Sequence, residues 1–373
     1  MGLLDYYRQF QEIDQEEWNR GLRERRARER ALALQRVPTI DLSSTEWPDL
    51  PYSEVVNAAI ARARGNVNSY PDRHAAGVRA LLAERHGVST EQIALGNGAA
   101  ELLQATAFAL LEPSDELLTP WPSYPLYPLM AQRARARPVP VDLAGGRADI
   151  GALADAAGER TRAVVLCNPN DPTGAYLPAD EVRELARALP DHVHLLVDEA
   201  YVHFQDVDPE DAVLRLVDGI DRILVFRTFS KVYGLSGLRA GYVVASEGHG
   251  ALLDTIAPAL GVNALTQAAV EQALKIGGGE VLRRRQLVIE QRRRVLRALH
   301  DLPVDAPDSQ ANFVWLRAAG LTGSELAASM ERKGVIVAPG GPLGDDEHVR
   351  ATIRGAAATE RLLEALTEAF ASA

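Results

Sequence analysis

The chain has 373 residues, and its 47% apolar and 24% charged residues are typical of a globular protein with two or three domains. A formal net charge of −11 argues against nucleic acid or an anionic membrane as the main partner, but it is compatible with a local basic pocket. The single cysteine, Cys167, lies in an apolar run, which predicts a buried side chain in a reducing, cytoplasmic compartment.

The first 36 residues are predicted to form a charged, amphipathic helical extension. Leu3, Tyr6, Phe10 and Trp18 are interleaved with many charged residues, and no apolar core of a signal peptide is present. The extension is expected to pack on the body of the protein or on a second subunit, and the sequence leaves both options open. No segment reaches the ~18 apolar residues of a membrane span.

Residues 51–263 are expected to form a large domain in which short apolar runs alternate with helical patterns. The runs are Ile93–Leu95, Leu117–Thr119, Pro138–Val141, Ala163–Cys167, Val193–Val197, Ile223–Phe226 and Gly241–Val244. Alternation of this kind predicts an α/β fold with a mostly parallel sheet. Strands that are apolar throughout indicate a sheet covered on both faces.

Residues 37–50 and 264–373 are expected to form a smaller α+β domain. A long helical stretch up to Leu299, interrupted near Gly277–Gly279, carries many arginines, for which a solvated helix face is favoured over nucleic-acid binding. Three strand-like segments and a final helix follow: Asn312–Leu316, Val335–Val337, Val349–Ile353 and Thr359–Phe370.

Lys231 is the strongest candidate for chemistry. Most lysines are surface charges, but Lys231 follows an apolar strand and precedes a glycine-rich turn that ends in Arg239. Burial at a strand end lowers the pKa of an amine and makes it a nucleophile. Ser230 and Arg239 could hold a phosphate beside it.

A turn after the first apolar run, Gly96–Glu101, could add anion-binding amides at Ala99 and Ala100, although such turns are often plain connections. Asp198 ends a buried strand, where α/β proteins bind ligands; the alternative is a helix N-cap. A carboxylate there could keep a pyridine nitrogen protonated.

Two further turns follow strands. Asn168–Gly174 contains two X-Pro steps and could be a rigid turn without a ligand. Tyr124, in the aromatic segment Trp121–Tyr127, could place its ring over a flat cofactor or could belong to the core.

Together these motifs resemble the PLP-dependent aminotransferases of fold type I (classes I and II), with the histidinol-phosphate aminotransferase and threonine-phosphate decarboxylase-like branch as the closest likeness. The resemblance covers residues from about Ile40 to Phe370. It implies pyridoxal 5′-phosphate (PLP) as cofactor, a seven-stranded sheet between helices in the large domain, and a homodimer with shared active sites.

The resemblance also implies roles for individual residues. Lys231 would form the aldimine with PLP and later move a proton. Asp198 would pair with the pyridinium nitrogen, Tyr201 and the residue at position 171 would contact the phenolic oxygen, and Tyr124 would stack on the ring. The phosphate would be bound by Ala99, Ala100, Thr228, Ser230 and Arg239. Tyr70 would reach the phosphate of the other subunit, and Arg350 would bind the substrate's acidic group, usually the α-carboxylate.

Three departures from the family pattern bear on the substrate. Asp171 replaces the family's Asn, so it either holds a proton or turns toward a cationic substrate group. Ala338 stands where histidinol-phosphate enzymes carry a phosphate-binding Arg, which makes strict histidinol-phosphate specificity doubtful. Trp47 either faces an apolar or aromatic substrate side chain or packs between the domains.

The leading function is therefore a ping-pong transfer of an amino group between an amino acid, or a related amine, and a 2-oxo acid. The alternative is a decarboxylase or other lyase on the same scaffold. A PLP-sensing regulator is disfavoured because the chain has no spare DNA-binding segment. The histidines show no metal-ligand spacing, so no metal site is predicted.

Overall fold

The computed structural model describes residues 21, 24–28 and 38–371. The expected N-terminal extension therefore lies mostly outside the described residues; residues 21 and 24–28 are helical and exposed. Among the described helices, none is both long and apolar enough to cross a membrane.

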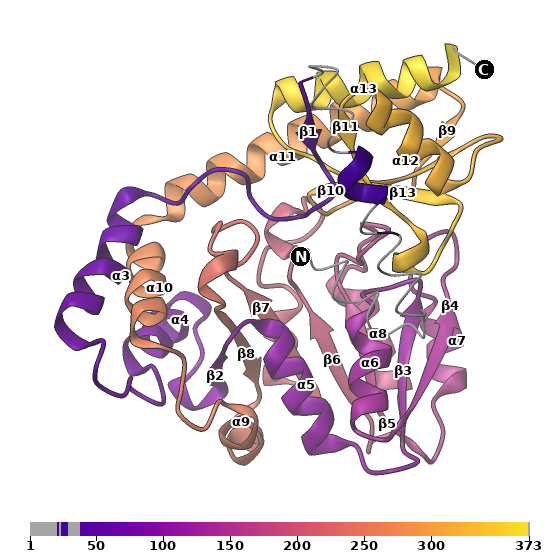
Figure 1. Ribbon diagram of the computed structural model, residues 1–373. Coiled ribbons are helices and arrows are strands. Elements are labelled where there is room, and N and C mark those ends of the chain that lie inside the picture. Colours follow the sequence, from indigo (N-terminus) through magenta and orange to yellow (C-terminus); the bar gives the residue numbers. More distant parts are fainter. Residues whose placement is uncertain (1–20, 22–23, 29–37, 372–373) are drawn as a thin grey trace.

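A seven-stranded sheet forms the centre of the larger part of the molecule (Figure 1). In spatial order its strands are β2 (Ile93–Gly96), β8 (Gly241–Ala245), β7 (Ile223–Thr228), β6 (His194–Asp198), β5 (Thr161–Cys167), β3 (Glu116–Trp121) and β4 (Arg137–Asp142). Strand β8 is antiparallel to both neighbours, and the other pairings are parallel. The predicted mostly parallel sheet is confirmed.

Alternate side chains of each central strand enter two separate apolar cores, one on each face of the sheet. In β5, Val164 and Leu166 belong to one core, whereas Val165 and Cys167 belong to the other. The first core also includes residues of α4 (Ala76–His86), α7 (Ile150–Ala156) and α8 (Ala179–Ala188). The second includes residues of α5 (Ala99–Leu110), α6 (Leu126–Arg133) and α9 (Gly250–Ile256). Burial on both faces explains why the strands are apolar throughout, and why Cys167 is buried.

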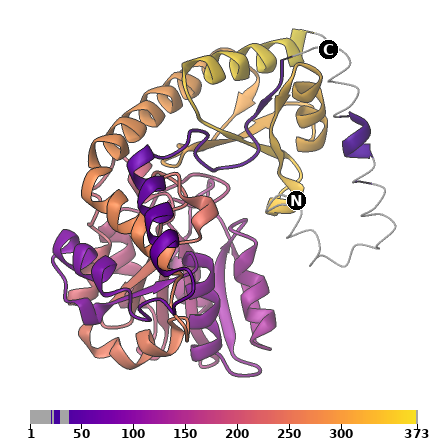
Figure 2. The same ribbon diagram turned by 60° about the vertical axis from the view of Figure 1, so that its left-hand side comes forward.

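A smaller antiparallel sheet lies beyond the carboxyl ends of the parallel strands (Figures 1 and 2). Its order is β12 (Ala338–Pro339), β13 (His348–Thr352), β10 (Phe313–Ala318) and β9 (Val304–Asp305), and a parallel pair joins β1 (Ile40–Asp41) to β11 (Val335–Ile336). Helices α12 (Gly323–Arg332) and α13 (Ala356–Ala371) accompany these strands.

Helices α10 (Ala264–Ile276) and α11 (Gly278–Ala298) form the long helical stretch, which is interrupted at Gly277 as predicted. Helix α10 packs on α3 (Ser53–Asn66) and α4, while α11 leads to the smaller sheet (Figure 2). The expected solvated arginine face is wrong for Arg284 and Arg292, which are buried. Their guanidinium groups donate to loop carbonyls, including that of Val232 for Arg284 and that of Phe204 for Arg292, each at 2.8 Å. The arginines thus join α11 to loops of the larger part.

Candidate active site

The candidate residues gather where the parallel strands end and the smaller sheet approaches them. Most of them lie at the carboxyl ends of β6 and β7 or in the loops after β3, β5, β6 and β7, while Ala99 and Ala100 begin α5 and β13 adds Arg350 from the smaller sheet. Ligands bind at the carboxyl ends of strands in open α/β sheets, because the loops there can vary while the sheet holds them in place.

Lys231 lies in the loop after β7 and is partly buried. Its Nζ atom donates to Thr45 Oγ1 at 2.5 Å and lies 5.1 Å from the centre of the Tyr201 ring. Burial lowers the pKa of Lys231 to about 8, although the charge of Asp171 acts in the opposite direction. A substantial fraction of the amine is therefore neutral near physiological pH, as a nucleophile requires. Sequence reasoning did not identify Thr45 as the partner of the lysine.

Asp198 is buried at the end of β6. Its carboxylate accepts hydrogen bonds from Tyr127 Oη at 3.0 Å and from the Ala200 amide at 3.1 Å. Burial raises the pKa of Asp198 to about 6, and the hydrogen bond from Tyr127 opposes the rise. Desolvation of this carboxylate favours a cationic partner. The sequence offered no specific signal for Tyr127 beyond its place in the aromatic segment.

Asp171, Tyr201 and Arg350 form a buried hydrogen-bonded group. The Tyr201 hydroxyl donates to Asp171 Oδ2 at 2.8 Å, and Arg350 Nη1 donates to Asp171 Oδ1 at 2.5 Å. Asp171 is 3% exposed and Arg350 is 6% exposed. The cation that Asp171 meets in the structure is therefore a residue of the protein itself.

An anion cradle lies between the loop after β7 and the start of α5. Thr228 Oγ1 donates to Ser230 Oγ at 3.0 Å, and Arg239 Nη1 donates to the same Ser230 oxygen at 3.3 Å. Arg239 has a positive φ of 53°, which is uncommon for a residue with a side chain. Gly98 precedes Ala99 and Ala100, whose amides belong to the first turn of α5, where backbone N–H groups lack helical partners.

Two glycines make this close approach possible. A Cβ atom on Gly241 would overlap the Ala99 nitrogen, and would lie 2.7 Å from the Gly98 carbonyl carbon. A Cβ atom on Gly98 would overlap the Arg239 guanidinium. Strand β8 and the amino end of α5 are therefore in direct backbone contact, which positions the helix terminus beside Arg239.

The remaining candidates lie around this group. The ring of Tyr124 meets that of Tyr127 edge-on, with 5.6 Å between centroids. Trp47 is 8% exposed, and the guanidinium of Arg284, in α11, lies 4.8 Å from its ring centre. Tyr70 is 85% exposed, so a single chain does not bring it into the site.

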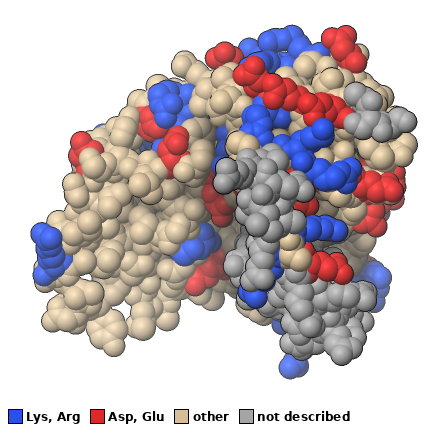
Figure 3. All heavy atoms as spheres, turned by 45° about the horizontal axis from the view of Figure 1, so that its top comes forward, with Lys and Arg blue, Asp and Glu red and all other residues tan. Residues whose placement is uncertain are grey.

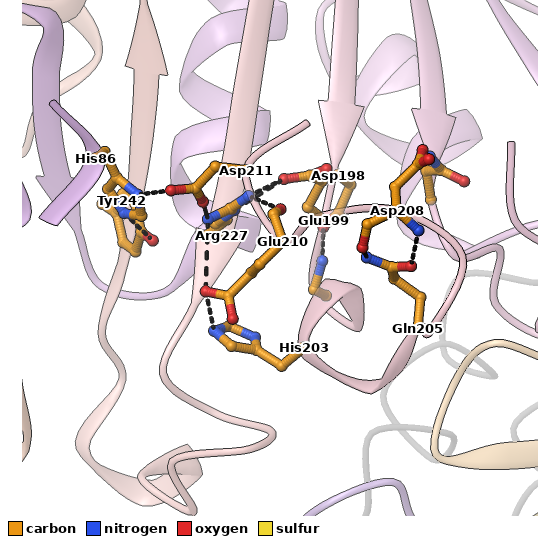
Figure 4. Close-up of polar contacts among 12 residues, drawn as sticks. His86, Asp198, Glu199, His203, Gln205, Asp208, Glu210, Asp211, Arg227 and Tyr242 are labelled. Atoms are coloured by element: carbon orange, nitrogen blue, oxygen red, sulfur yellow. Dashed lines mark hydrogen bonds and ion pairs between the residues drawn. The ribbon is translucent and has the colours of Figure 1, made fainter. Parts of the chain in front are cut away.

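A buried ionic network supports β6 and β7 beside the site (Figure 4). Arg227, in β7, donates to Glu199 at 2.8 Å and to Asp211 at 2.6 Å. His86 contacts Asp211 at 3.0 Å and Tyr242 at 2.9 Å. Burial raises the pKa of Glu199 to about 7 against the attraction of Arg227. The network anchors the chain directly after Asp198 and just before Lys231. In the sequence, the sign of this network is Arg227, a charged residue that directly follows the apolar run Ile223–Phe226.

Within the part of the chain that the structure describes, no group of three His, Cys, Asp or Glu side chains could hold a metal ion. The cation of Arg239 and the amides at the start of α5 suit an anionic ligand, and the Lys231 amine and the buried Asp198 carboxylate belong to the same set of strand ends.

Comparison with known proteins identifies the family. Residues 37–370 match the model of aminotransferase classes I and II. The chain belongs to this family. It is an aminotransferase, as the motifs predicted, and the family implies PLP as cofactor and amino and oxo acids as substrates.

Individual relatives and one solved structure are similar to this chain over most of its length. An aromatic amino acid aminotransferase of Corynebacterium jeikeium is 38% identical over 322 residues, which cover 84% of each chain. One of Thermobifida fusca is 40% identical over 302 residues, or 80% of this chain and 82% of the relative. A crystal structure of histidinol-phosphate aminotransferase from Sinorhizobium meliloti with bound PLP matches with a TM-score of 0.80 and 29% identity, over 93% of this chain and 94% of that chain.

Proposed function

We propose that this aminotransferase holds PLP on Lys231 and transfers an amino group between an amino acid, or a related amine, and a 2-oxo acid. The observation that supports this most strongly is the partly buried Lys231, with a pKa of about 8, which directly follows Ser230 of the anion cradle and interacts electrostatically with the buried Asp198 carboxylate.

The residues present fit PLP. The glycine contacts bring the amino end of α5 close to Arg239, which donates to Ser230, and this set of groups suits a phosphate dianion. Thr228, together with the Ala99 and Ala100 amides, would complete that set. The buried carboxylate of Asp198 suits the pyridinium nitrogen at the other end of the ring.

When bound, PLP supplies an electron sink for the bond broken at the substrate's Cα. Asp198 would hold a proton at the pyridine nitrogen, and Tyr127, which donates to Asp198, would orient it. Tyr201, which donates to Asp171 here, would donate to the phenolic oxygen, and the Tyr124 ring would cover the cofactor. The Lys231 amine moves the proton at Cα, because its lowered pKa lets it both accept and release a proton near neutrality.

On the substrate side, Arg350 would contact the group next to the transferred amine, and the loop of Trp47 borders the site. The names of the relatives support an apolar or aromatic side chain on the substrate. Ala338 is the register partner of Arg350 between β12 and β13, so no second arginine stands beside Arg350 there. This favours a substrate without a phosphate at that position.

The active unit is proposed to be a homodimer with shared sites. Tyr70 is 85% exposed and would complete the partner's phosphate site. Exposed apolar side chains gather nearby in sequence, at Leu50, Tyr52, Val56, Ile60 and Val67. The corresponding side of the molecule, where α3 and α10 lie in Figure 1, shows few charges in Figure 3. Such a surface suits burial against a second copy.

Two further proposals concern organisation and location. The division into a large and a smaller domain is retained, with α10 assigned to the large domain because it packs on α3 and α4. A cytoplasmic location is supported by the single, buried cysteine.

The test is to record the visible absorption of the purified protein and to add amino donors one at a time without an acceptor. Loss of the cofactor band with stoichiometric release of oxo acid supports transamination. Release of an amine and CO₂ instead would indicate the decarboxylase alternative. Absence of a band after incubation with PLP, or a band that Lys231→Ala leaves unchanged, would refute the proposal.

A further inference from the structure

Thr45 contacts both Lys231 and Tyr201, although it belongs to the segment that follows β1 in the smaller part of the molecule. It is 6% exposed. Resting on the proposed function, we propose that Thr45 is a positioning residue for the proton transfer at the substrate's Cα. Its hydroxyl holds the free amine of Lys231 through an N–H group, which leaves the lone pair of the amine open to take up the proton.

The direction of these hydrogen bonds follows from the acceptor at their far end. The Asp171 carboxylate, which is paired with Arg350, can only accept, so the single proton of Tyr201 Oη is donated to it at 2.8 Å. Tyr201 Oη lies 3.2 Å from Thr45 Oγ1 and has no second proton, so it accepts from Thr45. The Thr45 hydroxyl has then used its own proton, and it accepts from Lys231 Nζ at 2.5 Å.

A bound cofactor would preserve this direction. Under the proposed function, Tyr201 donates to the phenolic oxygen of PLP instead of to Asp171. The proton of Tyr201 is engaged in either case, so its oxygen still accepts from Thr45. Thr45 therefore still has only lone pairs to offer to Lys231.

Held in this way, the amine can gain and lose a proton without changing its place. A neutral amine and an ammonium group each have an N–H to donate to Thr45. When the Cα–H bond breaks, its electron pair stays with the substrate, and the proton forms an N–H bond with the free lone pair of Lys231. The reverse step returns that proton. A fixed nitrogen matters because small displacements of a reacting group lower the rate steeply.

The smaller sheet fixes the place of Thr45. The Leu42 amide donates to the Ile336 carbonyl of β11 at 2.7 Å, and the Leu42 carbonyl accepts from the Thr352 amide of β13 at 2.9 Å. The Thr45 carbonyl accepts from Asn312 Nδ2 at 3.1 Å, just before β10. The hydroxyl that contacts the lysine is therefore carried by a segment that is tied to the smaller sheet.

The pKa of Lys231 also responds to charged and titratable groups around it, which a change at position 45 leaves in place. They are Asp171 after β5, Asp198 at the end of β6, Tyr201 after β6, Arg350 in β13 and Glu46 after β1. An ammonium group donates a stronger hydrogen bond than a neutral amine does, so a hydroxyl that accepts from Lys231 stabilises the ammonium form. Loss of that hydroxyl should lower the pKa of Lys231, whereas loss of a hydroxyl that donates to the lone pair would raise it.

The experiment measures the pKa of Lys231 by labelling amines with acetic anhydride over a series of pH values, followed by mass spectrometry of the peptide that contains Lys231. The full-length protein is measured without cofactor and with pyridoxamine 5′-phosphate, which has no aldehyde to react with the lysine. The variants are Thr45→Val and Thr45→Ala, which lack the hydroxyl, and Thr45→Ser, which keeps it. The control is Thr255→Val, which removes an exposed hydroxyl from α9. Circular dichroism confirms that each protein is folded.

Thr45→Val and Thr45→Ala should lower the pKa of Lys231 by about 1, the difference between a hydrogen bond donated by a charged group and one donated by a neutral group. Thr45→Ser should restore most of this difference, and Thr255→Val should match the wild type. In the PLP-loaded protein, a single turnover of the cofactor band with L-phenylalanine should be about 10- to 100-fold slower in Thr45→Val, and Thr45→Ser should recover most of the rate.

An unchanged pKa in both variants without the hydroxyl would leave Thr45 with a packing role only, and a raised pKa would show that it donates to the lone pair. Either result refutes the inference, as does a single-turnover rate in Thr45→Val equal to that of the wild type. The measurement without cofactor depends on neither PLP nor turnover, so the inference can fail while the cofactor band still supports the proposed function. A lowered pKa in a protein that forms no cofactor band would refute the proposed function and leave the direction of the hydrogen bonds standing.

Discussion

The contact between Gly241 and the amino end of α5 makes a sharp prediction about cofactor binding. In Gly241→Ala, the added Cβ would overlap the Ala99 nitrogen and lie 2.7 Å from the Gly98 carbonyl carbon and 3.0 Å from Ala99 Cα. These are backbone atoms, so no side-chain rotation relieves the overlap. Strand β8 and the start of α5 must separate, which moves the Ala99 and Ala100 amides away from Arg239.

The magnitude follows from the hydrogen bonds that this shift weakens. Each hydrogen bond to a charged group contributes about 1.5–3 kcal/mol, so losing one weakens PLP binding about 10- to 100-fold, and losing both amides weakens it further. Overpacking of the backbone should also lower the free energy of unfolding by about 1–3 kcal/mol.

The assay is a fluorescence titration of cofactor-free protein with PLP at a temperature where all variants remain folded by circular dichroism. The matched control is Gly237→Ala, in the same loop region, because a Cβ on Gly237 would meet no atom within 4 Å. The control should bind PLP within about threefold of the wild type, since nothing that contacts the cofactor moves. Equal PLP affinity of Gly241→Ala and Gly237→Ala would refute the assignment of the cradle.

Three further predictions concern charge. In the cofactor-free protein, burial lowers the pKa of Lys231 from 10.5 to about 8, because the folded site favours the neutral amine. The stability that comes with the neutral amine is fully present above pH 10.5 and is lost as the pH falls through 8, where the amine takes up a proton. At pH 7 the free energy of unfolding of Lys231→Met, measured with urea, should therefore exceed that of the wild type by on the order of 3 kcal/mol. This difference should vanish near pH 10.5, and equal differences at both pH values would contradict the reasoning. Arg227→Met should lower the free energy of unfolding by about 3–5 kcal/mol because it leaves the buried carboxylate of Glu199 without its cation. The exposed Arg317→Met should cost less than about 1 kcal/mol, and similar urea midpoints for the two variants would disprove the difference. Tyr127→Phe should raise the pKa of Asp198 above about 6, because the hydrogen bond that lowers it is lost. When the pH is lowered, the PLP affinity of this variant should begin to decrease at a higher pH than that of the wild type. Identical pH profiles would show that Tyr127 does not affect Asp198.

The fold and the location of the site could be predicted from local sequence patterns. Apolar runs such as Ala163–Cys167 are long enough to be strands and too short for helices, and their regular alternation with helical segments leaves few arrangements other than a parallel sheet. Because parallel strands end at the same edge, the residues that follow them, such as Asp198 and Lys231, could be expected to meet. Glycines after the strands indicated that another group comes close to the backbone there, but the sequence did not show which atoms these would be.

Side-chain partners could be assigned only from the tertiary structure. Lys231 and its partner Thr45 are 186 positions apart, and Asp171 and Arg350 are 179 apart. Arg227 and Arg292 are likewise buried against carboxylates of distant segments, and Arg284 donates to the distant carbonyl of Val232 as well as to Glu280 of its own helix. The spacing of apolar residues indicates which face of a helix or strand is buried, because it depends only on the residues of that element. The pairing of a buried charge depends on which other segments the fold brings within hydrogen-bonding distance, and that is a property of the whole packed chain.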